Sequence, residues 1–529
     1  MDRRRVLIAW AGLLVVHALG VLVPVMDVDA AQYASMSAQM LREGNWLQVF
    51  DREVSYLDKP PLVFWLSACS IHLFGQVAWA YKLPSVLFAF AGCWGVFKFT
   101  RLHHDGRTAH LAALMYGSSV ALLQMTNDVR CDTLLTANVI LATWAGMAWL
   151  GQRQLKHLLL GALFIGLAML AKGPIGAVVP GLAIGGHLAI TGQWRALSDA
   201  RLLLVPLVIG AMLAPMCYAL YLQHGWQGVQ FFFWEQSFGR ITGSNRWHDD
   251  STGFFFLHTL VWVAAPWTLF IVYGTVKELF GVVRRKSRVP EYASLCGAVL
   301  TLTALSFSHY KLPHYLFVLM PFACVIGART LVGRHARIFD LLQLLLALLT
   351  FGLGSWLALV AFPNSGTPWA VAAGLCCIVA LVVYARSREH ARALWPTFII
   401  TIGAALVING HFYPTLLRYQ AGTQVGDKVR ELGVAQADLR NFATLSRALD
   451  FHAGYRVEWL RDIREASESI RPGRYVYCND EGREALIRAG HPPLQEWSFP
   501  AFPVQVVTID FLLPARRPSV VGTHYLLRY

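Results

Sequence analysis

Thirteen apolar runs, each about as long as a membrane span, constrain the fold of this chain more than any other feature. A helix of about 20 apolar residues crosses the hydrocarbon core of a bilayer. One further run, Leu62–Phe74, is too short to cross and follows two prolines, so it predicts a juxtamembrane or re-entrant helix. The sequence therefore predicts a mainly α-helical, polytopic membrane protein. The thirteen runs lie near residues 6–25, 81–100, 109–126, 133–150, 157–171, 174–191, 202–222, 254–276, 291–308, 313–332, 338–361, 368–385 and 394–411.

Composition excludes the main alternatives to a membrane protein. Of the 529 residues, 56% are hydrophobic and 14% are charged, whereas soluble domains average about 45–50% apolar and about 25% charged residues. A single soluble core of this size is excluded because cores stop growing beyond about 250–300 residues. An aromatic content of 12% excludes disorder. The 9 cysteines show no Cys-x-x-Cys or Cys/His ligand spacing, which excludes zinc-finger and thioredoxin-like proteins.

The net charge of +14 lies mainly in short joints between the apolar runs, which indicates membrane topology rather than nucleic-acid binding. Loops rich in Lys and Arg stay on the cytoplasmic side. With thirteen spans and a cytoplasmic N-terminus, every basic joint lies there, whereas counting Leu62–Phe74 as a span would place nearly all of them outside. Val6–Val25 has no small-residue cleavage site after it and is predicted as a retained first helix rather than a signal peptide. The joints are Arg3–Arg5, Arg101/Arg107, Arg153/Lys156, Arg195/Arg201, Arg284–Arg288, Arg334/Arg337 and Arg386–Arg392.

The same count places seven segments on the outer face, including the whole chain after about residue 412. There the composition changes, and helix-like pieces alternate with β-like runs. We therefore expect a transmembrane domain over 1–411, whose first outer loop is 26–80, and a small α/β extracytoplasmic domain over 412–529. The helix-like pieces are Thr423–Leu432 and Asp480–Ala489, and the β-like runs are Tyr475–Cys478, Val504–Phe511 and His524–Leu527. The other outer segments are 127–132, 172–173, 223–253, 309–312 and 362–367.

The first outer loop opens with two carboxylates, Asp27 and Asp29, where a span meets the outer face. Such groups are costly there unless they are solvated, paired or functional. Asp29 precedes a segment with helical spacing, so a helix N-cap is an alternative that is compatible with catalysis. Further on, Tyr56 and Asp58 precede Lys59, which two prolines follow. This cation suits a lipid phosphate, and an interfacial lysine that snorkels to water is the alternative.

Four other outer segments carry ionisable or aromatic residues, in each case with a structural alternative such as capping or an interfacial aromatic belt. Together they favour a one-sided site at the outer interface, because the spans themselves are nearly free of the mid-membrane charges that a transporter needs. Cations there would neutralise the phosphate that leaves a lipid donor, and a carboxylate would accept a proton from the incoming hydroxyl. The residues are Asp132, Lys172, Glu235, Arg240, Lys311 and Tyr315.

Seven motifs give the chain a resemblance to the C-type-fold (GT-C) membrane glycosyltransferases. The resemblance is to the branch of the dolichyl-phosphate-mannose protein mannosyltransferases and of the bacterial transferases that add 4-amino-4-deoxy-L-arabinose to lipid A. The motifs run in family order over about the first 330 residues, and only the ordered set is specific. They are DVDAAQYASMSAQML, YLDKPPLVFWL with IHLFG, YKLPS, DTLLTA, AKGPIG, FFFWEQSFGRI and SHYKLPHYLFVLMP.

The resemblance implies an inverting transfer of a sugar from an undecaprenyl-phosphate donor, at the periplasmic face of a bacterial inner membrane. The acceptor is a lipid A, a protein or a glycan. Asp29 and Asp132 match the family's two functional aspartates and are implied to be catalytic. The implied donor-phosphate residues are Tyr33, Tyr56, Lys59, Lys172, Arg240 and Tyr315. Lys311 joins them as an outer cation, and Asp27 and Glu235 are additional candidates.

The chain departs from the family at several positions. It has Ala30 and Gln32 where the family often has Glu and Arg, which leaves the sugar and the acceptor open. Relatives that bind a divalent ion use a Glu where this chain has Asp58 and a His where it has Ser237. Asp58 can still bind a divalent cation, but serine is a poor replacement for a histidine ligand, so no cofactor is required. A flippase or transporter of a lipid-linked sugar and a non-enzymatic partner-binding protein are the alternative functions.

Overall fold

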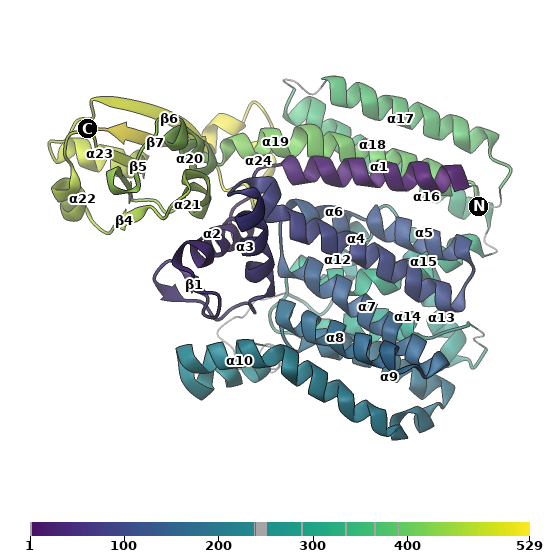
Figure 1. The fold of residues 1–529 in the computed structure, drawn as a ribbon. Coiled ribbons are helices and arrows are strands. Elements are labelled where there is room, and N and C mark those ends of the chain that lie inside the picture. The colour runs from purple at the N-terminus through teal and green to yellow at the C-terminus, as the bar shows by residue number, and fades with distance from the viewer. Residues whose placement is uncertain are drawn as a thin grey trace.

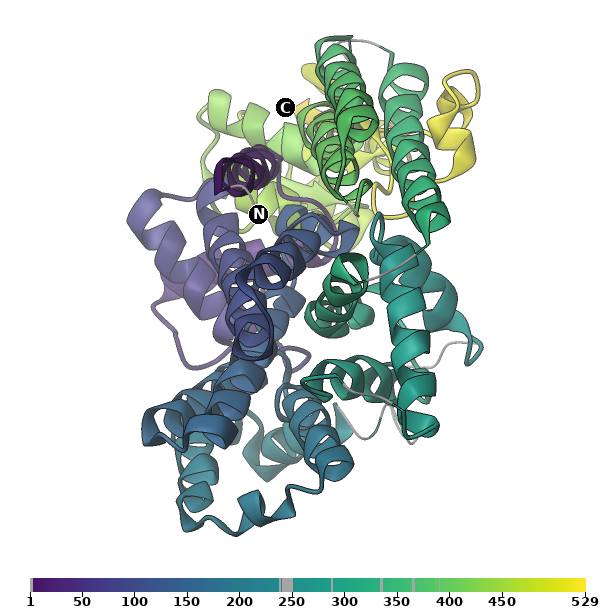
Figure 2. The same ribbon diagram turned by 90° about the vertical axis from the view of Figure 1, so that its right-hand side faces the viewer.

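The structure is a computed structural model that describes residues 3–236, 239, 251–286, 289–333, 336–363, 367–389 and 391–529. Most of the chain forms a bundle of long helices, and the N-terminus lies at one end of it (Figure 1). The opposite end carries helices α2 (Asp29–Glu43) and α3 (Leu62–Phe74) and the C-terminal sheet. Viewed along the helices, α16 to α18 lie on one side of the bundle and α8 to α10 on the other (Figure 2).

Each of the thirteen predicted spans is occupied by one helix or by two successive helical segments. Two spans, 109–126 and 254–276, are each divided into two α-helices by a residue that interrupts the helical hydrogen bonds. Ser119 begins α6 by accepting a hydrogen bond from the backbone N–H of Leu122, and Pro266, which lacks an N–H, lies between α12 and α13. The bundle helices are α1 (Arg3–Leu22), α4 (Ala78–His103), α5 (Gly106–Gly117), α6 (Val120–Asn127), α7 (Cys131–Gln152), α8 (Leu155–Lys172), α9 (Ile175–Thr191), α10 (Leu204–Gln230), α12 (Phe255–Val263), α13 (Thr268–Val283), α14 (Ala293–Ser306), α15 (Met320–Val332), α16 (Arg337–Trp356), α17 (Thr367–Arg386) and α18 (Leu394–Val407).

Within the described residues, 9 helical segments are long and apolar enough to cross a membrane. The predicted multi-pass architecture is therefore confirmed, while thirteen as the number of spans stays a prediction. The short run Leu62–Phe74 forms α3 with the predicted bounds, and at 13 residues it is shorter than those segments.

Two basic joints that are predicted to be cytoplasmic share one acidic partner. Glu389, in the joint between α17 and α18, accepts from Arg5 at 2.9 Å and from Arg107 at 3.1 Å. Arg5 follows the N-terminus and Arg107 follows the joint between α4 and α5. These three predicted cytoplasmic joints therefore lie together, at the end of the bundle that carries the N-terminus (Figure 1).

The C-terminal region folds around a five-stranded sheet of order β4-β3-β5-β7-β6, as the α/β prediction requires. β3 pairs in parallel with β4 and β5, and β7 pairs antiparallel with β5 and β6. The strands are β3 (Leu439–Phe442), β4 (Glu458–Leu460), β5 (Tyr475–Asn479), β6 (Gln495–Ala501) and β7 (Gly522–Arg528), and the helices are α20 (Ala421–Glu431), α21 (Arg447–Ala453), α22 (Ile463–Ser469), α23 (Asp480–Arg488) and α24 (Ile509–Leu512), with a short α19 (Tyr413–Leu416) before them.

The predicted β-like run Val504–Phe511 is wrong. The segment is a loop that leads into α24, whose N-terminus is capped by the Thr508 hydroxyl. The Phe511 ring stacks on Phe502 at 3.8 Å between ring centroids and packs edge-on against Tyr419. The apolar residues of this segment therefore pack in an aromatic cluster beside the bundle rather than on one face of a sheet.

Ion pairs fasten the C-terminal region to the first outer loop. The loop carries a small hairpin of β1 (Phe50–Asp51) and β2 (Val54–Ser55). Asp51 accepts from Arg447 at 2.6 Å, Arg52 donates to Asp450 at 2.5 Å, and Glu53 pairs with Arg456. The two predicted outer segments thus lie at the same end of the molecule, as the charge pattern predicts.

Candidate functional site

A buried ion pair between α7 and α8 forms the centre of the site. Lys172 ends α8, and Gly173, with φ +86°, reverses the chain so that α9 begins two residues later. Only glycine adopts such a backbone conformation without strain. The turn aims the Lys172 ammonium at Asp132, in the first turn of α7, with 2.6 Å between Nζ and Oδ1. Because Asp132 is only 3% exposed, the positive charge of Lys172 rather than water balances its negative charge.

The turn before α15 covers this ion pair from the other side. The Tyr315 ring centroid lies 4.5 Å from the Lys172 ammonium, which is a cation–π contact. His314 Nε2 lies 4.0 Å from the second oxygen of Asp132. Both residues belong to the 3-10 helix Pro313–Leu319, whose first residue is a proline. Two separate segments therefore fix the position of Lys172.

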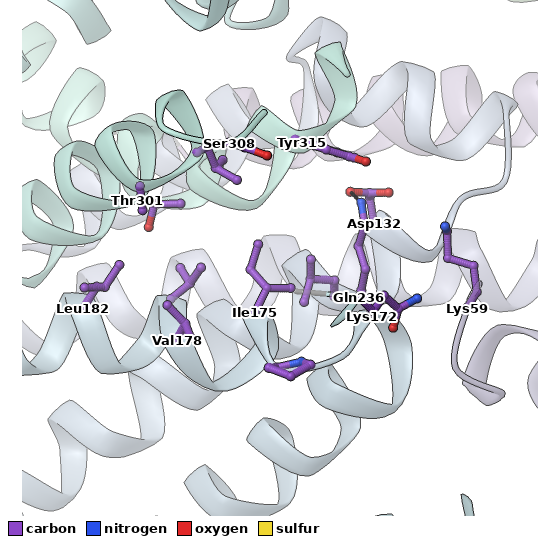
Figure 3. A pocket seen from close by; sticks show the side chains of 15 residues that line it. Lys59, Asp132, Lys172, Ile175, Val178, Leu182, Gln236, Thr301, Ser308 and Tyr315 are labelled. Atoms are coloured by element: carbon purple, nitrogen blue, oxygen red, sulfur yellow. Dashed lines mark hydrogen bonds and ion pairs between the residues drawn. The ribbon is translucent and has the colours of Figure 1, made fainter. Parts of the chain in front are cut away.

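The ion pair lies at the polar end of a groove of about 170 Å³ (Figure 3). Lys59 and Gln236 complete this polar end. Away from it, the walls are one face of α9 and one face of α14, since the lining positions follow helical spacing. Val178 keeps 42% of its surface exposed, so the apolar part of the groove is accessible from the side of the bundle. The wall residues are Ile175, Val178, Val179 and Leu182 from α9 and Thr301, Ala304 and Leu305 from α14.

Asp29 begins α2, and its partner is a cation rather than the helix. The helix has no side-chain cap, so the N-cap alternative is wrong. The Asp29 carboxylate accepts from Arg130 at 2.7 Å, and Arg130 also donates to Asp128 at 2.7 Å. Burial raises the pKa of Asp128, and the positive charge of Arg130 opposes that rise. The side chain of Asp29 is 41% exposed, which leaves its carboxylate accessible.

The Asp29 pair and the Lys172 pair are neighbours. Arg130, Cys131 and Asp132 are consecutive, so one short segment contributes to both. The Cys131 thiol lies within electrostatic range of Asp29, Lys59, Asp132 and Lys172. The structure therefore brings these four predicted residues, which come from four separate segments, to one region.

The two predicted tyrosines lie beside this region and share an aromatic partner. Tyr33 and Tyr56 both pack edge-on against Phe64, with ring centroids 5.5 and 6.0 Å away. Burial raises the pKa of both phenols, and the negative charge of Asp58 adds to the effect at Tyr56. Both phenols therefore stay protonated near neutral pH and act as hydrogen-bond donors rather than bases.

Other predicted residues do not line the groove. The Lys311 ammonium donates to the backbone carbonyl of Ser251 at 3.2 Å. Glu235 ends the short π-helical turn after α10 and is exposed, and Asp27 lines a different cavity. Arg240 lies outside the described residues.

The candidate metal ligands give no cluster. Among the residues that the structure describes, no three His, Cys, Asp or Glu side chains lie close enough together to hold a metal ion. Asp58 Oδ2 lies 3.9 Å from the Lys59 ammonium. Ser237, which stands where relatives have a histidine, is outside the described residues.

Sequence reasoning missed three residues of this region: Arg130, His314 and Gln236. Arg130 is two residues from each of two aspartates, and His314 lies between Lys311 and Tyr315 in the motif SHYKLPHYLFVLMP. Gln236 lines the groove and donates to the backbone carbonyl of Asp58. All three residues lie close in sequence to a predicted site residue, and this closeness could have indicated them. The side chain of Gln236 is a neutral amide, so its residue type gave no further indication of a role.

Comparisons with known proteins support the fold and show which proteins this sequence is similar to. The family model described as dolichyl-phosphate-mannose-protein mannosyltransferase matches residues 58–218, which include Lys59, Asp132 and Lys172. An undecaprenyl phosphate-alpha-4-amino-4-deoxy-L-arabinose arabinosyl transferase 2 from Pseudomonas fluorescens is 28% identical over 339 residues, which are 61% of this chain and 60% of the relative. The matched region thus spans about 60% of the length of the curated relative.

Two crystal structures of ArnT from Cupriavidus metallidurans have the same fold. The one bound to undecaprenyl phosphate has a TM-score of 0.75 at 17% identity and covers 99% of this chain and 98% of its own. The apo structure has a TM-score of 0.70 at 18% identity and covers 91% of this chain and 94% of its own. The predicted resemblance is therefore confirmed: the chain has the fold of the C-type-fold (GT-C) membrane glycosyltransferases, and its sequence is similar to the 4-amino-4-deoxy-L-arabinose transferases among them.

Proposed function

We propose that this chain is an inverting glycosyltransferase that takes a sugar from an undecaprenyl-phosphate donor at the periplasmic face of the inner membrane. The observation that carries the proposal is the two-part groove, whose polar end holds Lys59 and Lys172 and whose walls are apolar. A polyprenyl phosphate has the same division, with an anionic head on a hydrocarbon chain. The acceptor is a hydroxyl of a lipid A, a protein or a glycan.

The names of the relatives support the donor class. The Pseudomonas relative is named for an undecaprenyl phosphate sugar, and the ArnT structure with the same fold is bound to undecaprenyl phosphate. The sugar in the relative's name, 4-amino-4-deoxy-L-arabinose, is our first candidate for the group transferred.

In the proposed reaction, the acceptor oxygen forms a bond to the anomeric carbon while the bond from that carbon to the phosphate oxygen breaks. The electron pair of the breaking bond remains on the phosphate, where Lys59 and Lys172 stabilise the growing negative charge. The proton of the acceptor hydroxyl passes to the exposed Asp29 carboxylate. Asp132 is too deeply buried to meet the acceptor, so it acts by fixing the ammonium of Lys172.

Transfer in proteoliposomes tests this proposal, with labelled donor supplied only on the outer side. Asp29→Asn keeps the size of the side chain but removes the proton acceptor, and we expect it to abolish transfer. Lys59→Ala is expected to raise the KM for the donor about 10-fold or more, because a phosphate in a partly dry site loses a charged partner. Asp438→Asn and Lys156→Ala, which do not line the groove, are the matched controls.

Three outcomes would contradict the proposal. Full transfer by Asp29→Asn would remove the assigned base, and unchanged donor kinetics in Lys59→Ala would remove the phosphate site. Movement of labelled donor across the bilayer without sugar transfer would identify a transporter of the lipid-linked sugar instead.

A further inference from the structure

A separate cleft lies between α1 and α17, in the half of the bundle that carries the N-terminus. Its volume is about 390 Å³, and α18, which packs against both helices, forms its floor (Figure 1). The lining positions recur every three or four residues on each helix, so each helix contributes one face. The cleft shares no lining residue with the groove, and the proposed donor therefore does not account for it.

The cleft is open on the side of the bundle that faces the membrane. Ile8 on α1 keeps 71% of its surface exposed, and Val379 on α17 keeps 51%. Along α1 the cleft runs from Arg5 to Gly12, which is about 10 Å at about 1.5 Å per residue. This length is about two thirds of one leaflet of a hydrocarbon core about 30 Å thick. An acyl chain from that leaflet therefore fits the cleft better than a soluble ligand does.

The end of the cleft toward the N-terminus is positively charged. Among the described residues that line the cleft, Arg5 is the one with a charged side chain. Glu389 accepts from both Arg5 and Arg107, so these three side chains together keep a net positive charge. Arg386 ends α17 on the same face as Val383, one turn beyond it, and adds a further positive charge.

The surrounding sequence extends this positive charge. The segments 3–5 and 386–392 contain six arginines and one glutamate. Basic pockets between membrane helices bind the head groups of anionic lipids, and arginine pairs well with phosphate. A lipid with a net negative head is therefore favoured here over a zwitterionic one.

One helix of the cleft has few protein neighbours. The buried residues of α17 are Ala373 and Ala380, and the helix packs chiefly along α18. An acyl chain in the cleft would contact α1 and α17 at the same time, where side chains do not fill the space between them. The lipid would therefore hold α17 against the remainder of the bundle.

We propose that the cleft between α1 and α17 binds an anionic glycerophospholipid, with one acyl chain in the cleft and the phosphate beside Arg5 and Arg386. The lipid comes from the leaflet at the end of the bundle that carries the N-terminus, which is the predicted cytoplasmic leaflet. Because the cleft is separate from the groove, this inference does not rest on the proposed function. The bound lipid is a structural ligand rather than a donor.

Photocrosslinking of the full-length protein in phosphatidylcholine vesicles tests the proposal. The probes are phosphatidylglycerol and phosphatidylcholine with the same diazirine-labelled acyl chain, each added at the same mole fraction. We expect saturable labelling of peptides from α17 and α18 by phosphatidylglycerol, about 5-fold or more above that by phosphatidylcholine. Unlabelled phosphatidylglycerol should compete with the probe, and additional phosphatidylcholine should not.

A tryptophan in the cleft tests the position of the acyl chain. Val379→Trp fills the cleft and should abolish the saturable labelling. Ile378→Trp is the matched control, because Ile378 is the preceding residue of α17 and is also exposed but does not line the cleft. Phosphatidylglycerol should raise the melting temperature of the wild type and of Ile378→Trp in detergent, since a ligand of the folded state stabilises it. It should not raise that of Val379→Trp.

An arginine variant tests the head group without filling space. Arg5→Ala should lower the preference for phosphatidylglycerol about 5-fold and leave labelling by phosphatidylcholine unchanged. Lys156→Ala removes one positive charge from the same end of the bundle, because Lys156 is exposed at the start of α8, which runs to Lys172 at the site. This control should label like the wild type.

Four results would overturn the proposal. Equal labelling by the two lipids would show that the head group is not recognised, and wild-type labelling of Val379→Trp would place the acyl chain elsewhere. An equal loss of preference in Arg5→Ala and Lys156→Ala would show that the whole basic end attracts the lipid rather than this cleft. Stronger competition by undecaprenyl phosphate than by phosphatidylglycerol would assign the cleft to a polyprenyl lipid instead.

Discussion

Arg130 holds two carboxylates at once, Asp29 on one side and Asp128 on the other. Removing its charge leaves the two anions facing each other, and loss of one partner from a buried ion pair is costly. We therefore predict that Arg130→Ala lowers the rate of sugar transfer about 10-fold or more, because Asp29 loses its orientation. The measurement is kcat in proteoliposomes, with the melting temperature checked in parallel.

The conservative variants distinguish positioning from a general loss of structure. Arg130→Lys keeps the charge but cannot contact both carboxylates through a planar fork, so it should recover only part of the rate. Asp128→Asn keeps the contact from Arg130 to Asp29 and should transfer nearly as well as the wild type. Wild-type kcat in Arg130→Ala would show that Asp29 needs no partner.

The residues of the groove were predictable to different degrees. Lys59, Lys172, Asp132 and Tyr315 stand out because charges and tyrosines in short outer segments are costly without a function, and the structure brings all four together. Arg130 was not chosen, because which carboxylate a loop arginine binds depends on the path of the backbone. Lys311 shares the same sequence signal, yet it turns to a backbone carbonyl instead.

At the scale of helices, the crossing of α8 and α9 determines where Lys172 points. A Cβ added at Gly176 would lie 2.5 Å from the backbone carbon of Ala168, which is not a flexible side chain. We predict that Gly176→Val pushes the helices apart and lowers the stability of the folded protein by about 1–3 kcal/mol, as overpacking does. Thermal unfolding in detergent measures the effect, and donor affinity should fall with it.

Gly181→Val is the matched control on the same helix. A Cβ there meets nothing within 4 Å, so this variant has the same change in helix propensity without the collision. Equal melting temperatures for the two variants would mean that the close approach at Gly176 does not limit stability.

The helices were easier to predict than the strands. An apolar run of membrane length is a strong signal, because every backbone group in a bilayer must be hydrogen-bonded within the helix. Strand β4 has only 3 residues, and β6 carries a charged residue and a proline and has no fully buried side chain, so neither strand gives a strong apolar signal. Strand β6 tolerates Pro500 because it lies at the edge of the sheet.

At the scale of the whole molecule, the different composition of the two ends of the bundle predicts its orientation in the membrane. The basic joints lie at the end with the N-terminus, and the C-terminal sheet lies at the other (Figure 1). We expect a fluorescent protein fused to the N-terminus to fluoresce and an alkaline phosphatase fused after Tyr529 to be active, since the first requires the cytoplasm and the second the periplasm. Inactive phosphatase in a stable C-terminal fusion would reverse the orientation.

The side opening of the groove determines which donor concentration governs the proposed reaction. The lipid tail of the proposed donor stays in the bilayer, because each buried CH₂ adds about 0.8 kcal/mol to its retention. With Val178 exposed on the flank of the bundle, the donor arrives by diffusion in two dimensions. The KM for the donor is then expressed as the mole fraction of donor in the membrane lipid. Diluting the vesicles in buffer should leave the rate per enzyme unchanged, whereas diluting the donor with other lipids should lower it.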